Sequence, residues 1–305
     1  MSPSNKRTKS AARKPPSRQS QGPSRSASRP AARASRPGRS GNVRWVAVAI
    51  ALAIAVAIVV ATMGRGSKSK SAGSDSLVPK YGRAPAPASL VASVTSIPEQ
   101  VYNAVGLGTG ELPHRINESS SGTKPAILFV GAEFCPYCAA ERWAIVNALG
   151  RFGTFADLKV THSSSSDVFA NTETFSFYQS SYTSPYISFT PVEVQSNQPQ
   201  SGSYATLQLP TAQQQQIWQR YTTGYPFLYF AGRYVATSTY DPGVLANKTH
   251  AEIAAALRDP NNAIAKGAIG TANGITAAIC RLTNNRPSNV CGVPSIATLA
   301  RQLGT

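Results

Sequence analysis

A short apolar run that leads into a pair of cysteines constrains the fold of this chain most. Residues 126–130, Ala-Ile-Leu-Phe-Val, have turn-forming residues before them and a glycine after them, which is typical of a buried central strand. Residues 136–151 follow with good helix formers at helical spacings and glycines near their end. Cys135 and Cys138 therefore lie where a strand passes into the N-terminus of a helix.

The sequence after this helix predicts further strands, at residues 158–162, 174–178 and 184–194, where aromatic and β-branched residues alternate with polar ones. We expect the sheet to be mixed, or to carry an added hairpin. No internal repeat is present.

Three local signals define the chain beyond residue 210. Thr211 has the position of an N-cap before a glutamine-rich helix. Two β runs, residues 227–230 and 234–237, are joined by Ala-Gly-Arg, which predicts a hairpin. Thr249-His-Ala-Glu252 is a capping box that opens another helix.

The N-terminal residues 1–44 differ sharply from the rest of the chain. They carry +12 of the net charge of +17, contain no acidic residue, and are rich in Ser, Pro and Ala. Such a segment cannot form a packed core, so we predict a disordered basic arm. Two interpretations of the arm stay open: a solvated tail that only directs topology, or a surface for anionic lipid or nucleic acid, with no specific nucleic-acid partner expected.

An uncharged run of nineteen residues, 45–63, follows the arm. As a helix it would extend roughly 28 Å, which suits one membrane crossing. A cleaved signal peptide is the alternative, although the run is longer than the usual apolar region of such peptides. Because the basic residues concentrate before the run, we expect the N-terminus to be cytoplasmic and the remainder extracytoplasmic.

Residues 64–96 are rich in Ser, Gly, Pro and Ala and are predicted to form a flexible linker, with a folded domain over residues 97–305. The cell membrane is then the predicted location, with the domain outside. Disulfides persist in that compartment.

The order of these elements resembles the thioredoxin fold: a strand, a Cys-X-X-Cys helix, a strand, a helix, an X-Pro strand, a hairpin and a helix. The resemblance covers residues from about 124 to 258. Cys135-Pro136-Tyr137-Cys138 matches the dithiol motif of glutaredoxin-like members, and Tyr225-Pro226 matches the cis-proline beside it. The implied class is α/β, a thioredoxin-like three-layer sandwich with a mixed central sheet and a C-terminal helical extension, preceded here by one transmembrane helix and a disordered arm.

A longer match carries the segments VYNAVG, GAEFCPYCAAERWAIVNALGRFG and AAIC…VC. It resembles a prokaryotic family catalogued as a domain of unknown function with a thioredoxin-like core. This second resemblance covers about two thirds of the chain.

The position of the cysteine pair predicts its chemistry. Unpaired N–H groups and the positive dipole end of a helix stabilise a thiolate, so we expect the pKa of Cys135 to be depressed. Cys135 is the predicted attacking thiol, and Cys138, one turn inside, the resolving thiol. The resemblance implies that Pro136, Tyr137, Tyr225 and Pro226 contact the substrate.

One departure from thioredoxins concerns the proton acceptor. The strand position six before the first cysteine, where thioredoxins have a buried acid, is Phe129. Glu133 and Glu141 are the nearest substitutes, but the sequence favours both as solvated surface acids.

The remaining cysteines, Cys280 and Cys291, end a helical stretch and follow a polar turn, which predicts a structural disulfide of roughly 3 kcal/mol. A second redox couple that exchanges with Cys135 is the alternative. No His lies within twenty residues of the dithiol in the sequence, and the spacing of Cys280 and Cys291 does not fit a zinc knuckle. We therefore expect neither a metal nor a cofactor.

The function predicted from these features is that of a membrane-anchored thiol–disulfide oxidoreductase. Its expected partners are cysteine-containing client proteins, a membrane or soluble redox partner, and the membrane itself through one helix. Two alternatives stay open: a redox-inactive peptide-binding module, in which Cys135 and Cys138 form a permanent staple, and a metal-handling protein. The sequence does not distinguish an oxidant from a reductant or an isomerase.

Overall fold

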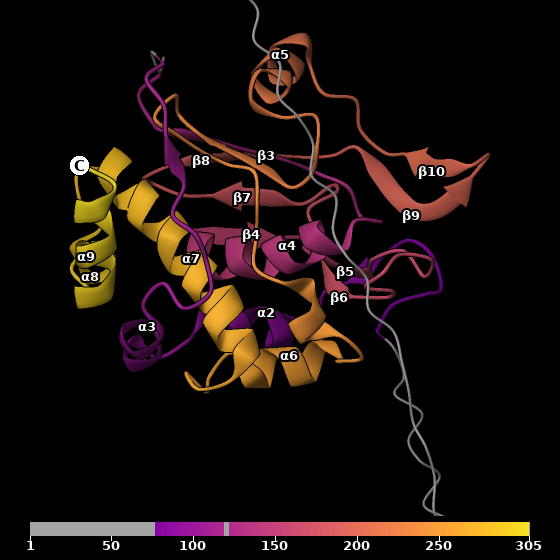
Figure 1. Cartoon of the computed structure of the whole chain (residues 1–305), viewed down its shortest axis with the longest axis horizontal. Helices are drawn as coiled ribbons and strands as arrows, with labels where there is room; N and C mark the ends of the chain where they lie inside the picture. Colours follow the sequence, from indigo (N-terminus) through magenta and orange to yellow (C-terminus); the bar gives the residue numbers. More distant parts are fainter. Residues whose placement is uncertain (1–76, 119–121, 305) are drawn as a thin grey trace, which may run out of the picture. The chain divides into compact units, whose positions relative to one another are not determined.

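The computed structural model describes residues 77–118 and 122–304 (Figure 1). The predicted basic arm and membrane span, residues 1–44 and 45–63, lie outside these residues. Within the described part of the chain, no helix is both long and apolar enough to cross a bilayer.

A mixed five-stranded sheet forms the centre of an α/β architecture, as predicted. Its strand order is β2-β12-β11-β3-β8, in which β3 runs parallel to β8 and antiparallel to β11. The predicted hairpin is confirmed, because β11 and β12 pair directly. The strands are β2 (His114–Arg115), β3 (Ala126–Gly131), β8 (Ser188–Glu193), β11 (Phe227–Phe230) and β12 (Tyr234–Ala236).

The alternation of side chains along β3 divides the core between the two faces of the sheet. Ile127 and Phe129 belong to the larger apolar cluster, which also contains α4 (Pro136–Leu149) and α7 (Ala263–Leu282). Leu128 and Val130 belong to a smaller cluster, against which α5 (Ala212–Tyr221) packs. Both faces of β3 are therefore covered, as its near-continuous apolar sequence requires.

The helices form two layers around the sheet (Figure 1). In that view α5 lies above the sheet, whereas α4 and α7 lie below it and pack against each other. Thr211 and Thr249 each form a capping box, at the start of α5 and α6, as the sequence predicted. The remaining helices are α2 (Ala88–Thr95), α3 (Glu99–Val105), the 3₁₀ helix η1 (Pro242–Leu245), α6 (His250–Ala256), α8 (Ser288–Cys291) and α9 (Pro294–Gln302).

One strand predicted from the sequence lies outside the central sheet. The run at residues 158–162 forms β5 (Lys159–His162), which pairs with β6 (Glu173–Ser176) and with β1 (Ala84–Pro85). The parallel partner of β3 is instead β8, within the predicted β segment 184–194. Both runs alternate in the same way, so local pattern alone does not show which one pairs with β3.

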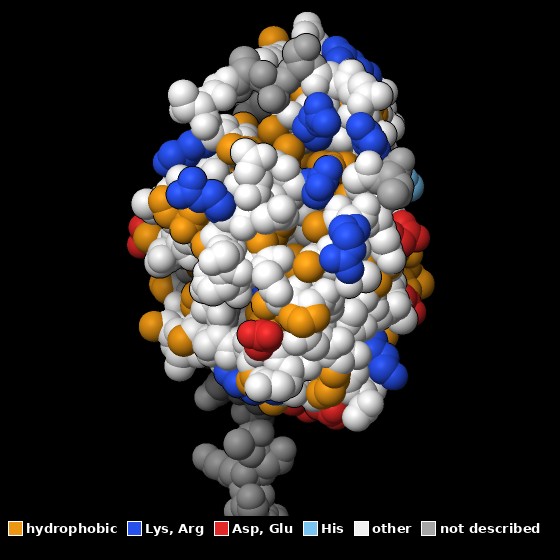
Figure 2. Space-filling view, turned by 90° about the vertical axis from the view of Figure 1, so that its left-hand side faces the viewer, with side chains coloured by type: hydrophobic (Ala, Val, Ile, Leu, Met, Phe, Trp, Pro, Cys, Tyr) orange, Lys and Arg blue, Asp and Glu red, His pale blue; other side chains and the backbone are white. Residues whose placement is uncertain are grey.

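Two hairpin-like pairs complete the structure. β9 (Gln195–Gln200) and β10 (Ser203–Thr206) form a two-stranded arm that projects from the body (Figure 1). β4 (Thr154–Ala156) pairs with β7 (Ser181–Thr183). The face on the side of α8 and α9 shows dispersed Lys and Arg side chains and only small separate hydrophobic areas (Figure 2).

The predicted linker over residues 64–96 is corrected where the structure describes it. From residue 77 on, the chain contributes β1 to a sheet and α2 to the core. Val78 is 7% exposed, Leu90 is 7% exposed and Val94 is fully buried. The Pro, Ala and Ser content suggested a linker, but the spacing of Leu90 and Val94 places both on one helical face.

Candidate active site

The dithiol lies immediately beyond the C-terminal end of β3. A short turn links β3 to α4, and Cys135 is the N-cap of that helix with Pro136 at its first position. The Sγ atom of Cys135 accepts a hydrogen bond from the backbone N–H of Cys138 at 3.3 Å. Both cysteines are free thiols in the structure.

The two thiols differ in access and in acidity. Cys135 is 8% exposed, and Cys138 is fully buried. The Cys138 thiol donates to the Cys135 sulfur and lowers the pKa of Cys135; burial opposes this effect, and backbone N–H groups support it. Burial raises the pKa of Cys138, and the neighbouring Cys135 raises it further. Cys135 is therefore the thiol that ionises first.

A buried ion pair lies one helical turn beyond Cys138. The Nε and Nη2 atoms of Arg142 donate to the carboxylate of Glu193, at the end of β8, at 2.8 and 2.6 Å. Both side chains are fully buried. The positive charge of Arg142 lowers the pKa of both cysteines, although it is not the largest cause at either.

Glu133 is not the solvated surface acid that the sequence favoured, since it is fully buried. Arg83 Nη1 donates to one of its carboxyl oxygens at 2.7 Å, and the Ser176 hydroxyl donates to the other. Burial raises the pKa of Glu133 to about 7, Glu193 adds to the rise, and Ser176 and the two arginines oppose it. Arg83 immediately precedes β1 and Ser176 lies in β6, both far from Glu133 in the sequence. The turn sequence around Glu133 therefore gives no sign of either partner.

Glu141 is also buried, at 1% exposure, which corrects the prediction of a surface acid. Neither of its carboxyl oxygens has a hydrogen-bond partner within the described residues. Burial raises its pKa to about 7, and the nearby Thr239 hydroxyl offsets only a part of that rise. A signal for its burial was present, because Glu141, Arg142 and Asn147 interrupt a helix whose remaining residues are largely apolar on every face.

The predicted substrate-contacting residues gather beside the dithiol. Pro136 and Pro226 are buried, Tyr225 is half-buried, and Tyr137 is 44% exposed. The Tyr225–Pro226 peptide bond is cis. Burial raises the pKa of the Tyr225 hydroxyl to about 12, and the charges of both cysteines add to the rise.

Further aromatic side chains, which the sequence did not single out, surround these residues. The Phe134 ring stacks on Tyr204 of β10, with ring centroids 4.2 Å apart, and meets Tyr225 edge-on at 6.3 Å. The Tyr225 ring also stacks on Trp218 of α5 at 5.2 Å. We call the set that borders the dithiol the aromatic rim: Phe134, Tyr137, Phe169, Tyr204, Trp218 and Tyr225.

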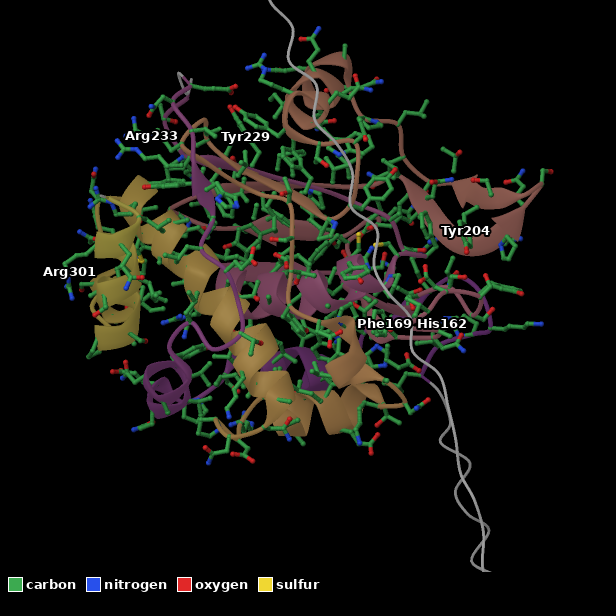
Figure 3. The ribbon with its side chains drawn as sticks, viewed as in Figure 1. His162, Phe169, Tyr204, Tyr229, Arg233 and Arg301 are labelled. Atoms are coloured by element: carbon green, nitrogen blue, oxygen red, sulfur yellow. A yellow bond between two sulfur atoms is a disulfide. The ribbon has the colours of Figure 1, made fainter. Side chains whose placement is uncertain are left out.

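The rim draws on segments that are distant in sequence. Tyr137 meets Phe169 edge-on at 5.9 Å. The Tyr204 hydroxyl donates to the Ser164 hydroxyl at 2.7 Å, which fixes the β9–β10 arm against the loop after β5. Figure 3 shows Phe169 and Tyr204 on the same side of the molecule, opposite Arg233 and Arg301.

The second cysteine pair is separate from the first. Cys280 and Cys291 form a disulfide that links α7 to α8, and both are buried in the cluster around α4 and α7. Cys135 and Cys138 belong to the other cluster. Buried in this way, the disulfide offers no open surface for exchange with Cys135.

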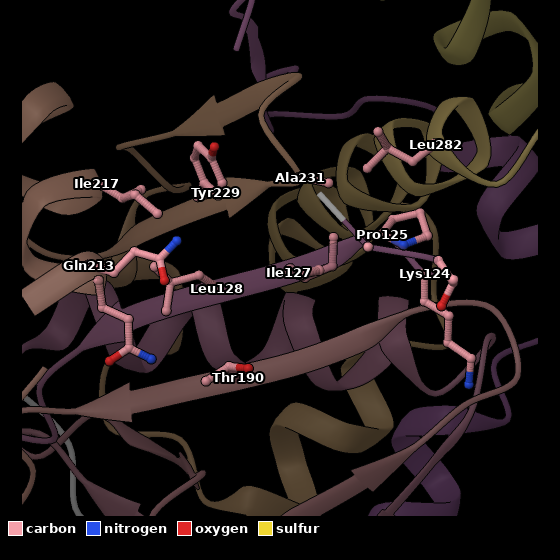
Figure 4. A pocket seen from close by; sticks show the side chains of 14 residues that line it. Lys124, Pro125, Ile127, Leu128, Thr190, Gln213, Ile217, Tyr229, Ala231 and Leu282 are labelled. Carbon is pink, nitrogen blue, oxygen red and sulfur yellow. The ribbon is translucent and has the colours of Figure 1, made fainter. Parts of the chain in front are cut away.

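A groove of about 460 Å³ lies away from the dithiol, on the α5 side of the sheet. It is lined by the first residues of β3, by Thr190 of β8 and by Gln213 and Ile217 of α5 (Figure 4). The cysteines follow the opposite end of β3, so this groove is not the chemical site. The described residues contain no group of three or more His, Cys, Asp or Glu placed to hold a metal ion.

Comparison with known proteins gives one match. A family model described as a domain of unknown function, DUF929, matches residues 116–281, which is more than half of the chain and includes the dithiol, Glu193 and the cis-proline. No curated protein matches this sequence, and no solved structure matches it. The chain belongs to the DUF929 family.

Proposed function

We propose that the protein is a thiol–disulfide oxidoreductase of thioredoxin-like fold that exchanges disulfides with client proteins through Cys135 and Cys138. The observation that carries the proposal is the asymmetry of the two thiols. Cys135 caps a helix, accepts a hydrogen bond from the backbone N–H of Cys138 and has a pKa that the Cys138 thiol lowers, whereas Cys138 is fully buried. This is the arrangement that an attacking and a resolving thiol require.

The topology of the central sheet supports the thioredoxin-like part of the proposal. In β8-β3-β11-β12 the Cys-X-X-Cys helix follows β3, a parallel partner comes next in the sheet, and an X-Pro turn leads into an antiparallel hairpin. That order is the one on which the resemblance in sequence rests. The strands β1, β2, β4, β5, β6 and β7 and the β9–β10 arm are additions to it.

The reaction proceeds in two exchanges. The Cys135 thiolate attacks one sulfur of a client disulfide, and a mixed disulfide forms while the other client sulfur leaves as a thiolate. Cys138 then loses its proton to the medium and attacks the Cys135 sulfur, which closes the Cys135–Cys138 disulfide and releases the second client thiol. The client gains two electrons and the dithiol loses them; in the reverse direction the client is oxidised.

The aromatic rim supports client binding next to Cys135. Tyr and Trp provide large contact areas with one polar group, and they are enriched where proteins bind one another. The rim residues contain no charged side chain. A redox-inactive peptide-binding module would use the same surface, so the test has to separate binding from chemistry.

The test compares two serine variants in the full chain. Cys138→Ser retains the attacking thiol but cannot release the client, so we expect mixed disulfides that a reductant dissolves; Cys135→Ser is the matched control and should trap almost none. Non-reducing gels, with mass spectrometry of the adducts, give the result. If Cys138→Ser traps no client and the wild type neither oxidises nor reduces a model peptide, the oxidoreductase proposal fails and peptide binding replaces it.

Membrane anchoring and extracytoplasmic location form the second part of the proposal. They rest on the sequence of residues 1–63, with its basic arm and uncharged run. A membrane-impermeant thiol reagent applied to intact, reduced cells should label Cys135. Labelling that requires cell lysis would place the domain on the cytoplasmic side.

A further inference from the structure

A small polar cavity lies behind the dithiol helix. It is enclosed by α4, β12 and the residues after it, α7, and the segment 111–114. Its volume of about 10 Å³ is close to what a single water molecule needs. The cavity therefore has room for one ligand of that size.

Three of the residues that line this cavity have buried side-chain oxygens without partners. Glu141, Thr239 and Thr271 all line it. By geometry, both carboxyl oxygens of Glu141 and the hydroxyl oxygens of the two threonines are buried without a hydrogen bond to any described residue, although the Thr239 hydroxyl lies near enough to the Glu141 carboxyl to lower its pKa in part. Buried polar atoms almost always have a partner, so four such oxygens around one cavity indicate a ligand that they share.

The charge of the lining is negative. Glu141 and Glu111 both line the cavity, and no Lys or Arg does. Glu111 accepts a hydrogen bond from the Ser238 hydroxyl at 2.6 Å. His114, the one lining residue that can become cationic, is exposed. The Glu141 carboxylate thus has no cationic side chain against it within the lining.

The nature of the ligand follows from that charge. Below a pH of about 7 Glu141 is protonated and a water molecule satisfies the site, whereas above that pH water would leave a buried carboxylate uncompensated, which costs several kcal/mol. A divalent ion needs six or more oxygen ligands, several of them waters for Mg²⁺, which a cavity with room for one water does not supply, and the described residues offer no cluster of three or more acidic, His or Cys ligands. The ionised Glu141 carries one negative charge, so a cation of single charge neutralises it, and carboxylate and hydroxyl oxygens suit a hard cation.

We propose that this cavity binds one small monovalent cation, with Na⁺ as the size match, through the Glu141 carboxylate and the hydroxyl oxygens of Thr239 and Thr271. The ion joins the dithiol helix to α7 and to the segment after β12. This site is independent of the exchange chemistry proposed above, so either proposal can fail without the other.

The test measures thermal unfolding of the full chain in NaCl and in choline chloride at equal ionic strength, about one pH unit above the pKa of Glu141. For the wild type we expect NaCl to raise the unfolding midpoint by about 2–4 °C at an ion concentration of about ten times Kd. Glu141→Gln should abolish the difference. Glu99→Gln, which removes an exposed acid on α3, should retain it.

Thr271→Val keeps the carboxylate and removes one ligand oxygen, so we expect the NaCl effect to shrink without vanishing. This variant also covers the case in which Glu141→Gln fails to fold. Equal midpoints of the wild type in both salts would mean that the cavity holds only water. An effect that persists in Glu141→Gln would place the ion elsewhere. Either outcome overturns the proposal.

Discussion

Arg142 and Glu193 form a two-point ion pair, at 2.8 and 2.6 Å, beneath the dithiol and out of contact with solvent. The pair leaves the Nη1 atom of Arg142 buried without a hydrogen-bond partner in the described part of the chain. Because Arg142 follows Cys138 by one helical turn, its charge acts on the cysteines through a medium of low dielectric constant. Where thioredoxins place a buried acid, this chain has Phe129 and, nearby, a buried cation.

The first prediction follows from this pair and concerns the acidity of Cys135. Arg142→Met should raise the pKa of Cys135, because the positive charge that favours the thiolate is removed. Glu193→Gln should shift the pKa the other way, because Arg142 then lacks its neutralising partner. The pH dependence of thiolate ultraviolet absorbance measures both.

Stability provides the control for these variants. Each one breaks a buried ion pair and should reduce the free energy of unfolding by about 3–5 kcal/mol. A general loosening of the site would move the pKa of Cys135 in the same direction in both variants. Opposite shifts at similar loss of stability therefore identify an electrostatic cause, and equal shifts would contradict it.

The direction of the reaction is linked to the same pair. A stabilised thiolate lowers the free energy of the reduced dithiol and makes its disulfide a stronger oxidant. Arg142→Met should therefore shift the equilibrium with glutathione toward the disulfide form. Glu193→Gln should shift it toward the dithiol. Thiol quantification at equilibrium gives both values.

The sequence predicted the parts of the fold that depend on local pattern. The apolar run 126–130 became β3, and the capping boxes at Thr211 and Thr249 begin α5 and α6. What it did not predict was pairing at long range. The alternation in β5 and β8 is similar, and only tertiary contacts decide that β8 lies beside β3.

The site shows the same division. Cys135 and Cys138 are placed by a motif, and their positions at the start of α4 could be predicted. The burial of Glu133 depends on Arg83, fifty residues earlier, and on Ser176, which lies in another sheet. The stacking of Tyr204 on Phe134 depends on the fold of the β9–β10 arm. No pattern within the turn itself contains this information.

The pKa of Glu141 leads to a prediction about stability and pH. Its value is about 7 in the folded protein and 4.5 for an unperturbed Glu, so the folded state binds more protons between these values. Stability should fall as the pH rises through this range, by up to roughly 3 kcal/mol in total, and no further fall from this group is expected above it.

Glu141→Gln should remove this dependence, because glutamine mimics the protonated acid. In choline buffer the variant should be more stable than the wild type at about pH 8, by about 1–3 kcal/mol, and nearly equal to it at about pH 5. Urea unfolding at both pH values measures the difference. Lower stability of the variant at the higher pH would show that the carboxylate is well compensated in the wild type.

The Cys280–Cys291 disulfide should stabilise the fold without taking part in exchange. It closes a loop over a sequence separation of 11, which gives about 3 kcal/mol in the chain-entropy model. The double variant Cys280→Ser, Cys291→Ser should lose about that much free energy of unfolding. Its rate of exchange with a small disulfide should match the wild type, and a large loss of rate in the folded variant would make this pair a second redox couple.

The aromatic rim should determine the use of protein clients but not of small disulfides. Tyr204 stacks on Phe134, the residue before Cys135, and its hydroxyl donates to Ser164, so Tyr204→Ala removes one ring of the aromatic rim. Loss of one aromatic contact of about 0.5–1.5 kcal/mol should reduce kcat/KM for a peptide client with aromatic flanks by about 3–10-fold. Exchange with a small disulfide, which is too short to reach the rim, should be unchanged. Tyr81→Ala is the matched control, because Tyr81 is 38% exposed and its ring contacts no residue of the aromatic rim in the described part of the chain. Equal losses for the peptide and the small disulfide would mean that Tyr204 supports the geometry of the dithiol and does not bind clients.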